Sequence, residues 1–242
     1  MKYLDAVIRL LEAVRDTQEE AIEQAAVHVA EALLGDRLVY IFGASHAGIL
    51  AQEMFYRAGG LVPVNPILPP GLVTDVRPVT LTSRLERLPG FGAQILAETP
   101  LQAGDVLIVH SVSGRNAAAV EVAEEGKKRG AYVIALTSLT YSRSVQARQP
   151  GMKRLFEVAD LVLDDLAPVG DALVKVDGLE QQVAPASTIT GAAILHEVTV
   201  RAVEKIVAVQ GDAPVFRSAN LDGGEAHNQK WLDFYKGRLL YL

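Results

Sequence analysis

The stretch from Asp105 to Ser138 constrains the fold more strongly than any other part of the sequence. It opens with the unbroken apolar run VLIV at 106–109, which is typical of a strand buried on both faces of a parallel sheet. A polar loop follows, and then a helix rich in alanine and glutamate that closes on KKRG, the basic residues and glycine favoured at a helix C-terminus. A second apolar run, YVIAL at 132–136, completes the stretch. We therefore predict one βαβ unit, which is almost always right-handed.

The loop between the first strand and the helix carries polar groups suited to an anion. Ser111 and Ser113 supply hydroxyl donors, and Gly114 allows the backbone to approach a ligand closely. Asn116 can cap the helix or donate a hydrogen bond. Free backbone N–H groups and the positive end of the helix dipole meet at this point, as phosphate sites require. The loop predicts a phosphate site, and simple capping of the helix is the alternative.

Two further strand ends carry hydroxyl groups. The apolar run VYIF at 39–42 breaks into the loop GASHAG, which places Ser45 and His46 directly after a strand. The second strand of the βαβ unit ends in Thr137 and Ser138. Because the carboxyl ends of parallel strands share one edge of a sheet, these side chains are predicted to converge there, where open α/β folds bind ligands.

At these residues the sequence resembles a known family. GASHAG after a strand, SVSGRN after a strand and a strand ending in TS look like the sugar isomerase (SIS) phosphosugar-binding domain, over roughly 33–209. The segments HAGILAQEMFYRAGGLVPVNPIL and SANLDGGEAHNQK resemble a subgroup of single-domain SIS proteins. The resemblance implies a three-layer αβα sandwich, flavodoxin-like, with a central parallel sheet of five strands and a long N-terminal helix. It also implies that the ligand is a sugar phosphate.

The whole chain, 1–242, is expected to form a single SIS domain. Apolar residues recur at helical spacing over 2–34, which predicts an N-terminal helical segment interrupted near Asp16. A core over 35–210 follows, and a tail over 211–242 is predicted to pack on that core or on a neighbouring subunit. Prolines and glycines interrupt the pattern between 65 and 104, where one short helix, 93–98, is expected. A short hairpin or extended excursion is expected over 171–182.

Composition argues against several classes of protein. The net charge of −6 and the absence of a basic face argue against nucleic-acid binding. No run approaches the roughly 18 apolar residues of a membrane span, and no signal-peptide pattern is present. There is no cysteine, and none of the histidines has HxxxH or HxH spacing. We expect a cytoplasmic protein that needs neither a metal nor another cofactor.

The resemblance also supplies candidates for catalysis. Phosphoheptose isomerases, which are SIS proteins, carry a catalytic glutamate and a catalytic histidine on helices that correspond to those of Glu53 and His196. An ion-paired helical glutamate and an interface histidine are the structural alternatives. The dense polar stretch 218–228 suggests a loop that reaches a ligand pocket of its own or a neighbouring subunit, with His227 among its reactive groups. Thr188, at the start of the last long helix, is a further candidate for substrate binding.

A carboxylate and a histidine suffice, without a metal, for aldose–ketose isomerisation, which moves a proton between neighbouring carbons through an enediol. We therefore predict an isomerase of an aldose, ketose or amino-sugar phosphate. Two alternatives stay open. One is a SIS-type sugar-phosphate ether lyase, and the other is a phosphosugar-sensing module that keeps the serines and needs no base. Because related domains build their sites at subunit boundaries, a homodimer or a higher even-numbered oligomer is also expected.

Overall fold

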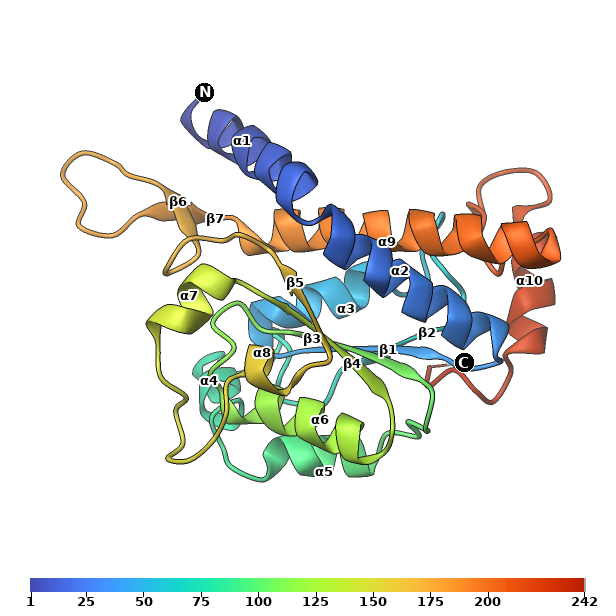
Figure 1. Cartoon of the computed structure of the whole chain (residues 1–242), viewed down its shortest axis with the longest axis horizontal. Coiled ribbons are helices and arrows are strands. Elements are labelled where there is room, and N and C mark those ends of the chain that lie inside the picture. The colour runs from blue at the N-terminus through green and yellow to red at the C-terminus, as the bar shows by residue number, and fades with distance from the viewer. Residues whose placement is uncertain (242) are drawn as a thin grey trace.

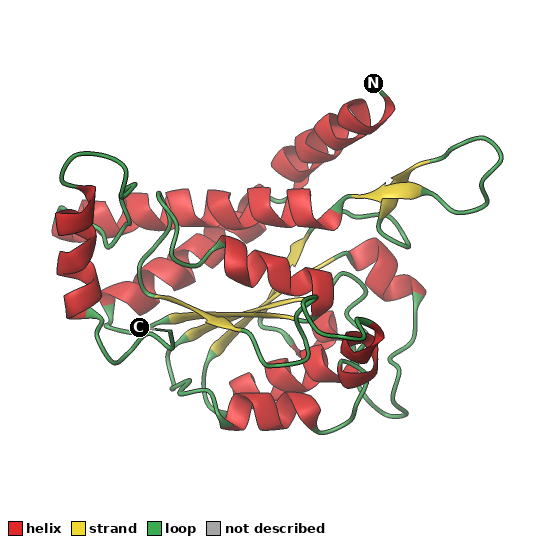
Figure 2. Cartoon of the chain, turned by 180° about the vertical axis from the view of Figure 1, so that it is seen from behind, coloured by secondary structure: helices red, strands yellow, loops and turns green. Residues whose placement is uncertain are grey.

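The computed structural model describes residues 1–241 and confirms the predicted three-layer arrangement (Figure 1). Five parallel strands form the central sheet in the order β2-β1-β3-β4-β5. Helices cover both faces of the sheet, as the view from behind also shows (Figure 2). The strands are β1 (Val39–Gly43), β2 (Val64–Ile67), β3 (Val106–His110), β4 (Tyr132–Thr137) and β5 (Leu161–Asp164).

The apolar runs form strands because both of their faces are buried. Every residue of β1 and β3 is buried, and Ile41 lies beside Ile108 in the parallel register. Since side chains alternate along a strand, Ile41 and Ile108 belong to one apolar cluster, whereas Tyr40 and Leu107 belong to the cluster on the opposite face. The sheet therefore separates two cores.

The helices divide between these two cores. On one face lie α2 (Glu19–Leu34), α3 (Ile49–Glu53) and α9 (Ser187–Gln210). On the other face lie α5 (Phe91–Ala97), α6 (Ala117–Lys128) and α8 (Leu155–Val158). The remaining helices are α1 (Lys2–Thr17), the short 3-10 helix η1 (Ser45–Gly48), α4 (Thr80–Leu85), α7 (Leu139–Ser144) and α10 (Gly224–Phe234).

Two segments differ in detail from the expectation. The N-terminal helical segment is interrupted at Gln18, and α1 projects beyond the body of the molecule (Figure 1). The segment 65–104 holds two short helices, α4 and α5, rather than one. The hairpin expected over 171–182 forms as the antiparallel pair β6 (Ala172–Val174) and β7 (Val183–Pro185). It projects beside α1 (Figure 2).

The tail packs at the end of the sheet where the strands begin (Figure 1). Its first part pairs with the segment before β2, because the Val62 N–H donates to the Pro214 carbonyl at 2.7 Å. Its last part is held by Asn65, whose Oδ1 accepts from the Leu240 N–H at 2.7 Å. The boundaries predicted at 34 and 211 stay predictions, and residue 242 lies outside the described part. No helix within residues 1–241 combines the length and the apolar character that crossing a bilayer requires.

Candidate functional site

The strand order places two hydroxyl-bearing loops at a topological switch point. In the order 2-1-3-4-5 the chain proceeds in opposite directions from β1 and from β3, so the loops after these two strands border a crevice where α/β folds bind ligands. The loop after β1 carries Ser45, and the loop after β3 carries Ser111 and Ser113. The loop after β4 joins them, since the Ser138 N–H donates to the Val112 carbonyl at 3.0 Å. The structure thus brings the predicted loops together.

Gly114 is required by the path of the β3–α6 loop. Its φ is +57°, and its N–H donates to the Ser111 carbonyl at 3.0 Å. A Cβ at this position would come within 2.6 Å of the Ser142 Oγ. Ser142 in turn donates to the Ser113 carbonyl at 3.0 Å, which fixes the serine loop against α7. The glycine therefore serves the shape of the loop.

The hydroxyl groups of this edge fall into two sets. Thr137 and Ser138 are fully buried, and both use their hydroxyls inside the protein. Thr137 donates to the Ser111 carbonyl at 2.7 Å, and Ser138 donates to the Ala167 carbonyl at 2.6 Å while it caps α7. By contrast, within residues 1–241 the partly exposed hydroxyls of Ser111 and Ser113 have no hydrogen-bond partner. These two are free to bind a ligand, and Thr137 and Ser138 hold the loops in place.

Ser45 and His46 lie in η1, on the β1 side of the crevice. Ser45 adopts a φ of +57°, which a residue other than glycine rarely does, and its N–H donates to the Leu72 carbonyl at 2.6 Å. Such a backbone conformation is often found at functional sites. Ser45 is partly exposed and His46 is exposed, so both side chains are accessible.

The two helix-start candidates have different surroundings. Asn116 is the N-cap residue of α6, but its Oδ1 accepts from the Arg148 Nε at 2.6 Å rather than from the helix backbone. Thr188 lies in the first turn of α9 and is partly exposed. Its neighbour Ser187 is buried and donates to the Asp171 Oδ2 at 2.8 Å. Asp171 thus anchors the start of α9.

Glu53 and His196 form a hydrogen-bonded pair between α3 and α9. The His196 Nε2 lies 3.1 Å from the Glu53 Oε1, and Arg57 also contacts this oxygen. With Nε2–H donating to the carboxylate, the Nδ1 of His196 keeps a free lone pair. Burial, and next the charge of Arg57, lower the pKa of His196, so the imidazole is neutral near pH 7. The arrangement can accept a proton.

A second histidine–carboxylate pair lies beneath the loops, and the sequence did not reveal it. His110 ends β3, is 1 % exposed, and donates from Nδ1 to the Ala47 carbonyl at 3.0 Å. Its Nε2 lies 3.9 Å from the Oδ2 of the fully buried Asp165. Burial lowers the pKa of His110 to about 4 and raises the pKa of Asp165 to about 8, so both groups are neutral at pH 7. The only signal in the sequence was a histidine at the end of an apolar run.

His227 lies apart from the Glu53–His196 pair in this chain. It belongs to α10, beside the end of the sheet where the strands begin (Figure 1), and its Nε2 donates to the Val215 carbonyl at 3.0 Å. Across residues 1–241 no three histidine or acidic side chains are grouped closely enough to hold a metal ion.

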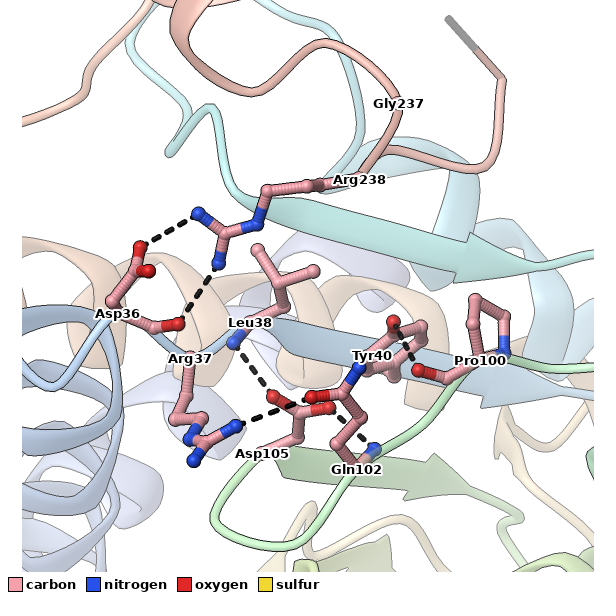
Figure 3. A pocket seen from close by; sticks show the side chains of 9 residues that line it. All are labelled: Asp36, Arg37, Leu38, Tyr40, Pro100, Gln102, Asp105, Gly237 and Arg238. Atoms are coloured by element: carbon pink, nitrogen blue, oxygen red, sulfur yellow. Dashed lines mark hydrogen bonds and ion pairs between the residues drawn. The ribbon is translucent and has the colours of Figure 1, made fainter.

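A small pocket of 140 Å³ lies at that same end of the sheet (Figure 3). Asp105 accepts there from the N–H groups of Leu38 at 2.9 Å and Gln102 at 2.7 Å. Arg238 pairs with Asp36 at 2.6 Å. The charged groups drawn together in Figure 3 are occupied with one another, so this pocket joins the tail to the sheet.

Comparisons with known proteins agree with this architecture. A SIS domain model matches residues 2–138. A UPF0309 protein from Shouchella clausii is 46% identical over 241 residues, which cover 100% of this chain and 98% of that protein. The phosphoheptose isomerase GmhA from Neisseria gonorrhoeae matches with a TM-score of 0.55 at 19% identity, over 82% of this chain and 93% of that one. The E. coli CFT073 protein c3406, solved in complex with a sugar phosphate, matches with a TM-score of 0.51 at 16% identity, over 86% and 88% of the two chains.

At such identities the two solved structures show a shared fold. The SIS model covers more than half of the chain, and the relative from Shouchella clausii is similar from end to end. With its five parallel strands and its serine loops at the switch point, the chain belongs to the SIS domain family.

Proposed function

We propose that this protein binds a sugar phosphate and isomerises it by proton transfer through an enediol. The observation that carries the proposal is the hydrogen bond between Glu53 and His196, which joins the two helices that start at the serine-loop edge. Glu53 lies eight residues after Ser45, and His196 lies eight residues after Thr188. Each pair is about 12 Å apart along a helix, and helical side chains lean back towards the N-terminus. A phosphate at the loops would thus place the sugar towards the pair.

His196 is the proposed base. Its Nδ1 takes the proton from the carbon next to the carbonyl and returns it to the neighbouring carbon. Glu53 holds the ring through Nε2–H and stabilises the imidazolium that forms in between. Ser111, Ser113 and the free N–H groups of their loop hold the phosphate, so that binding energy is used to position the sugar.

The family supports the ligand class. The SIS domain is shared with the phosphoheptose isomerase from Neisseria gonorrhoeae, and the E. coli CFT073 protein with this fold was solved with a sugar phosphate. One observation favours the non-catalytic alternative: the ion pair of Glu53 with Arg57 is what a structural helical glutamate would make. A phosphosugar sensor is therefore the second candidate, and turnover separates the two.

The first test is binding. Wild-type protein is heated with a panel of sugar phosphates and with their unphosphorylated parents. A ligand at 100 times its Kd should stabilise the fold by about 2.7 kcal/mol and raise the Tm. Ser113→Ala should weaken binding by roughly 1–3 kcal/mol, because a hydrogen bond to a charged group is lost. If no sugar phosphate raises the Tm, the proposed phosphate site does not exist.

The second test is turnover of the ligands that bind. Glu53→Gln should leave their Kd nearly unchanged and lower kcat by roughly 10²-fold or more, because an amide cannot stabilise an imidazolium. Glu197→Gln, which changes an exposed glutamate paired with Arg201 on the same helix α9, is the matched control and should retain kcat. Binding without isomerisation of any bound sugar phosphate would identify the protein as a sensor.

A further inference from the structure

Three arginines gather beside the serine loop. Arg87 follows α4, Arg115 follows Gly114 within the loop, and Arg148 follows α7. We call these three side chains the arginine cluster. Within residues 1–241 none of them forms an ion pair with a carboxylate, in contrast to Arg154 and Arg201, which do.

Hydrogen bonds hold the three segments together. The Gln149 Nε2 donates to the Arg87 carbonyl at 3.2 Å, and the Arg148 N–H donates to the Arg115 carbonyl at 3.1 Å. The Arg148 Nε donates to the Asn116 Oδ1 at 2.6 Å, which ties this side chain to the start of α6. Burial, followed by the charges of Arg87 and Arg115, lowers the pKa of Arg148. Three like charges are thus kept near one another by the fold.

The cluster is short of negative charge. The Nε of Arg115 is buried and has no hydrogen-bond partner within the described residues, and an unsatisfied donor of this kind is costly. Glu86 is the acidic side chain whose charge acts on Arg148, and burial raises the pKa of Glu86. One acid of weakened acidity faces three arginines, so an incoming anion would be attracted and could satisfy the buried donor.

The cluster is also within reach of a ligand in the serine loop. Arg115 comes two residues after Ser113, so their Cα atoms are at most about 7 Å apart. Given the proposed function, on which this inference rests, we propose that the arginine cluster binds a second anionic group of the substrate. The substrate is then a sugar phosphate that carries a further phosphate or carboxylate.

Matched pairs of ligands test the proposal by titration calorimetry. Fructose 1,6-bisphosphate is compared with fructose 6-phosphate, and 6-phosphogluconate with glucose 6-phosphate. Wild-type protein should bind at least one doubly anionic member about tenfold or more tightly than its partner, the size expected of hydrogen bonds to charged groups. The preferred pair tells a phosphate from a carboxylate. Raising the salt concentration should reduce the preference.

Substitution of the exposed members then assigns the preference to the cluster. Arg87→Gln and Arg148→Gln, together, should abolish the preference and leave the affinity for the monophosphates unchanged. Arg143→Gln is the control, since Arg143 is exposed on α7 and lies over Phe156. Equal affinity within both ligand pairs overturns the inference, and so does a loss that is the same for both members of a pair. If no sugar phosphate binds at all, the proposed function fails with it.

Discussion

At the scale of single residues, the neutral pair of His110 and Asp165 links protonation to the stability of the ligand-binding edge. His110 is held by the Ala47 carbonyl of η1, and Asp165 accepts from the Ala167 N–H at 2.9 Å. The further charges that act on the pair are those of Asp164 and Asp171. Neither the His110 Nε2 nor the Asp165 Oδ2 has a hydrogen-bond partner within the described residues. Ionising either group inside the sheet edge is costly.

Asp165→Asn should therefore change how stability depends on pH. Between pH 3.8 and about 8 the folded wild type keeps a proton on Asp165 that the unfolded chain has lost, so its free energy of unfolding falls as the pH rises. His110 opposes this below pH 6.5, since there the unfolded chain binds the extra proton. From pH 6.5 to 8 the variant should gain about 1.5 kcal/mol on the wild type. Urea unfolding at both pH values measures this. Parallel pH profiles would contradict it, and Glu180→Gln, in the exposed hairpin loop, serves as control.

How far the site could be predicted depends on where each polar group finds its partner. Ser111, Ser113 and Gly114 were placed at the edge by local pattern alone, because strand ends and helix starts are visible in the sequence. The same pattern could not show that Thr137 and Ser138 donate to carbonyls at Ser111 and Ala167, since those partners depend on the three-dimensional fold. The catalytic roles of Glu53, His196 and His227 stay predictions.

At the scale of elements, the strands of the core were predictable because burial on both faces leaves an unbroken apolar run. The helices between 65 and 104 were not, because a distant residue holds one of them. The Glu121 carboxylate, on α6, accepts from the N–H groups of Gly90 at 2.7 Å and Gly92 at 2.9 Å and so caps α5. The interruption at Gln18 likewise involves a distant partner, since its Oε1 accepts from the Asp164 N–H at 3.0 Å.

Glu121→Ala should release the start of α5. Two charge-assisted hydrogen bonds at a helix N-terminus are lost, which should lower the free energy of unfolding by about 1–2 kcal/mol. Amide exchange at Gly90 and Gly92 should accelerate more than at residues of β3. Glu124→Ala removes a carboxylate one turn along the same helix, on which no hydrogen bond depends in the described chain, and should have little effect. Unchanged exchange at Gly90 and Gly92 in Glu121→Ala would show that α5 does not need this cap.

At the scale of the whole molecule, α1 and the hairpin project from the compact body (Figures 1 and 2). The side chain of Tyr3 ties the two together by donating to the Pro185 carbonyl at 2.8 Å. Along α1 the apolar side chains of Leu4 and Ile8 are 48% and 55% exposed, and Val200 on α9 is 52% exposed. Apolar residues recurring along a projecting helix are typical of a surface that binds another protein.

We predict that this surface joins two copies of the chain. Light scattering coupled to size exclusion should then give about twice the chain mass of 26.0 kDa, or a higher even multiple. Leu4→Glu with Ile8→Glu should shift the mass towards that of one chain, because burying two carboxylates in an apolar contact is strongly unfavourable. Arg9→Gln, at an exposed polar position of α1, should leave the assembly intact. A wild type that remains a monomer at micromolar concentration, or an oligomer that tolerates both glutamates, would exclude α1 as the contact. A loss of sugar-phosphate turnover in the monomeric variant, with its fold intact, would further indicate that the site needs both copies.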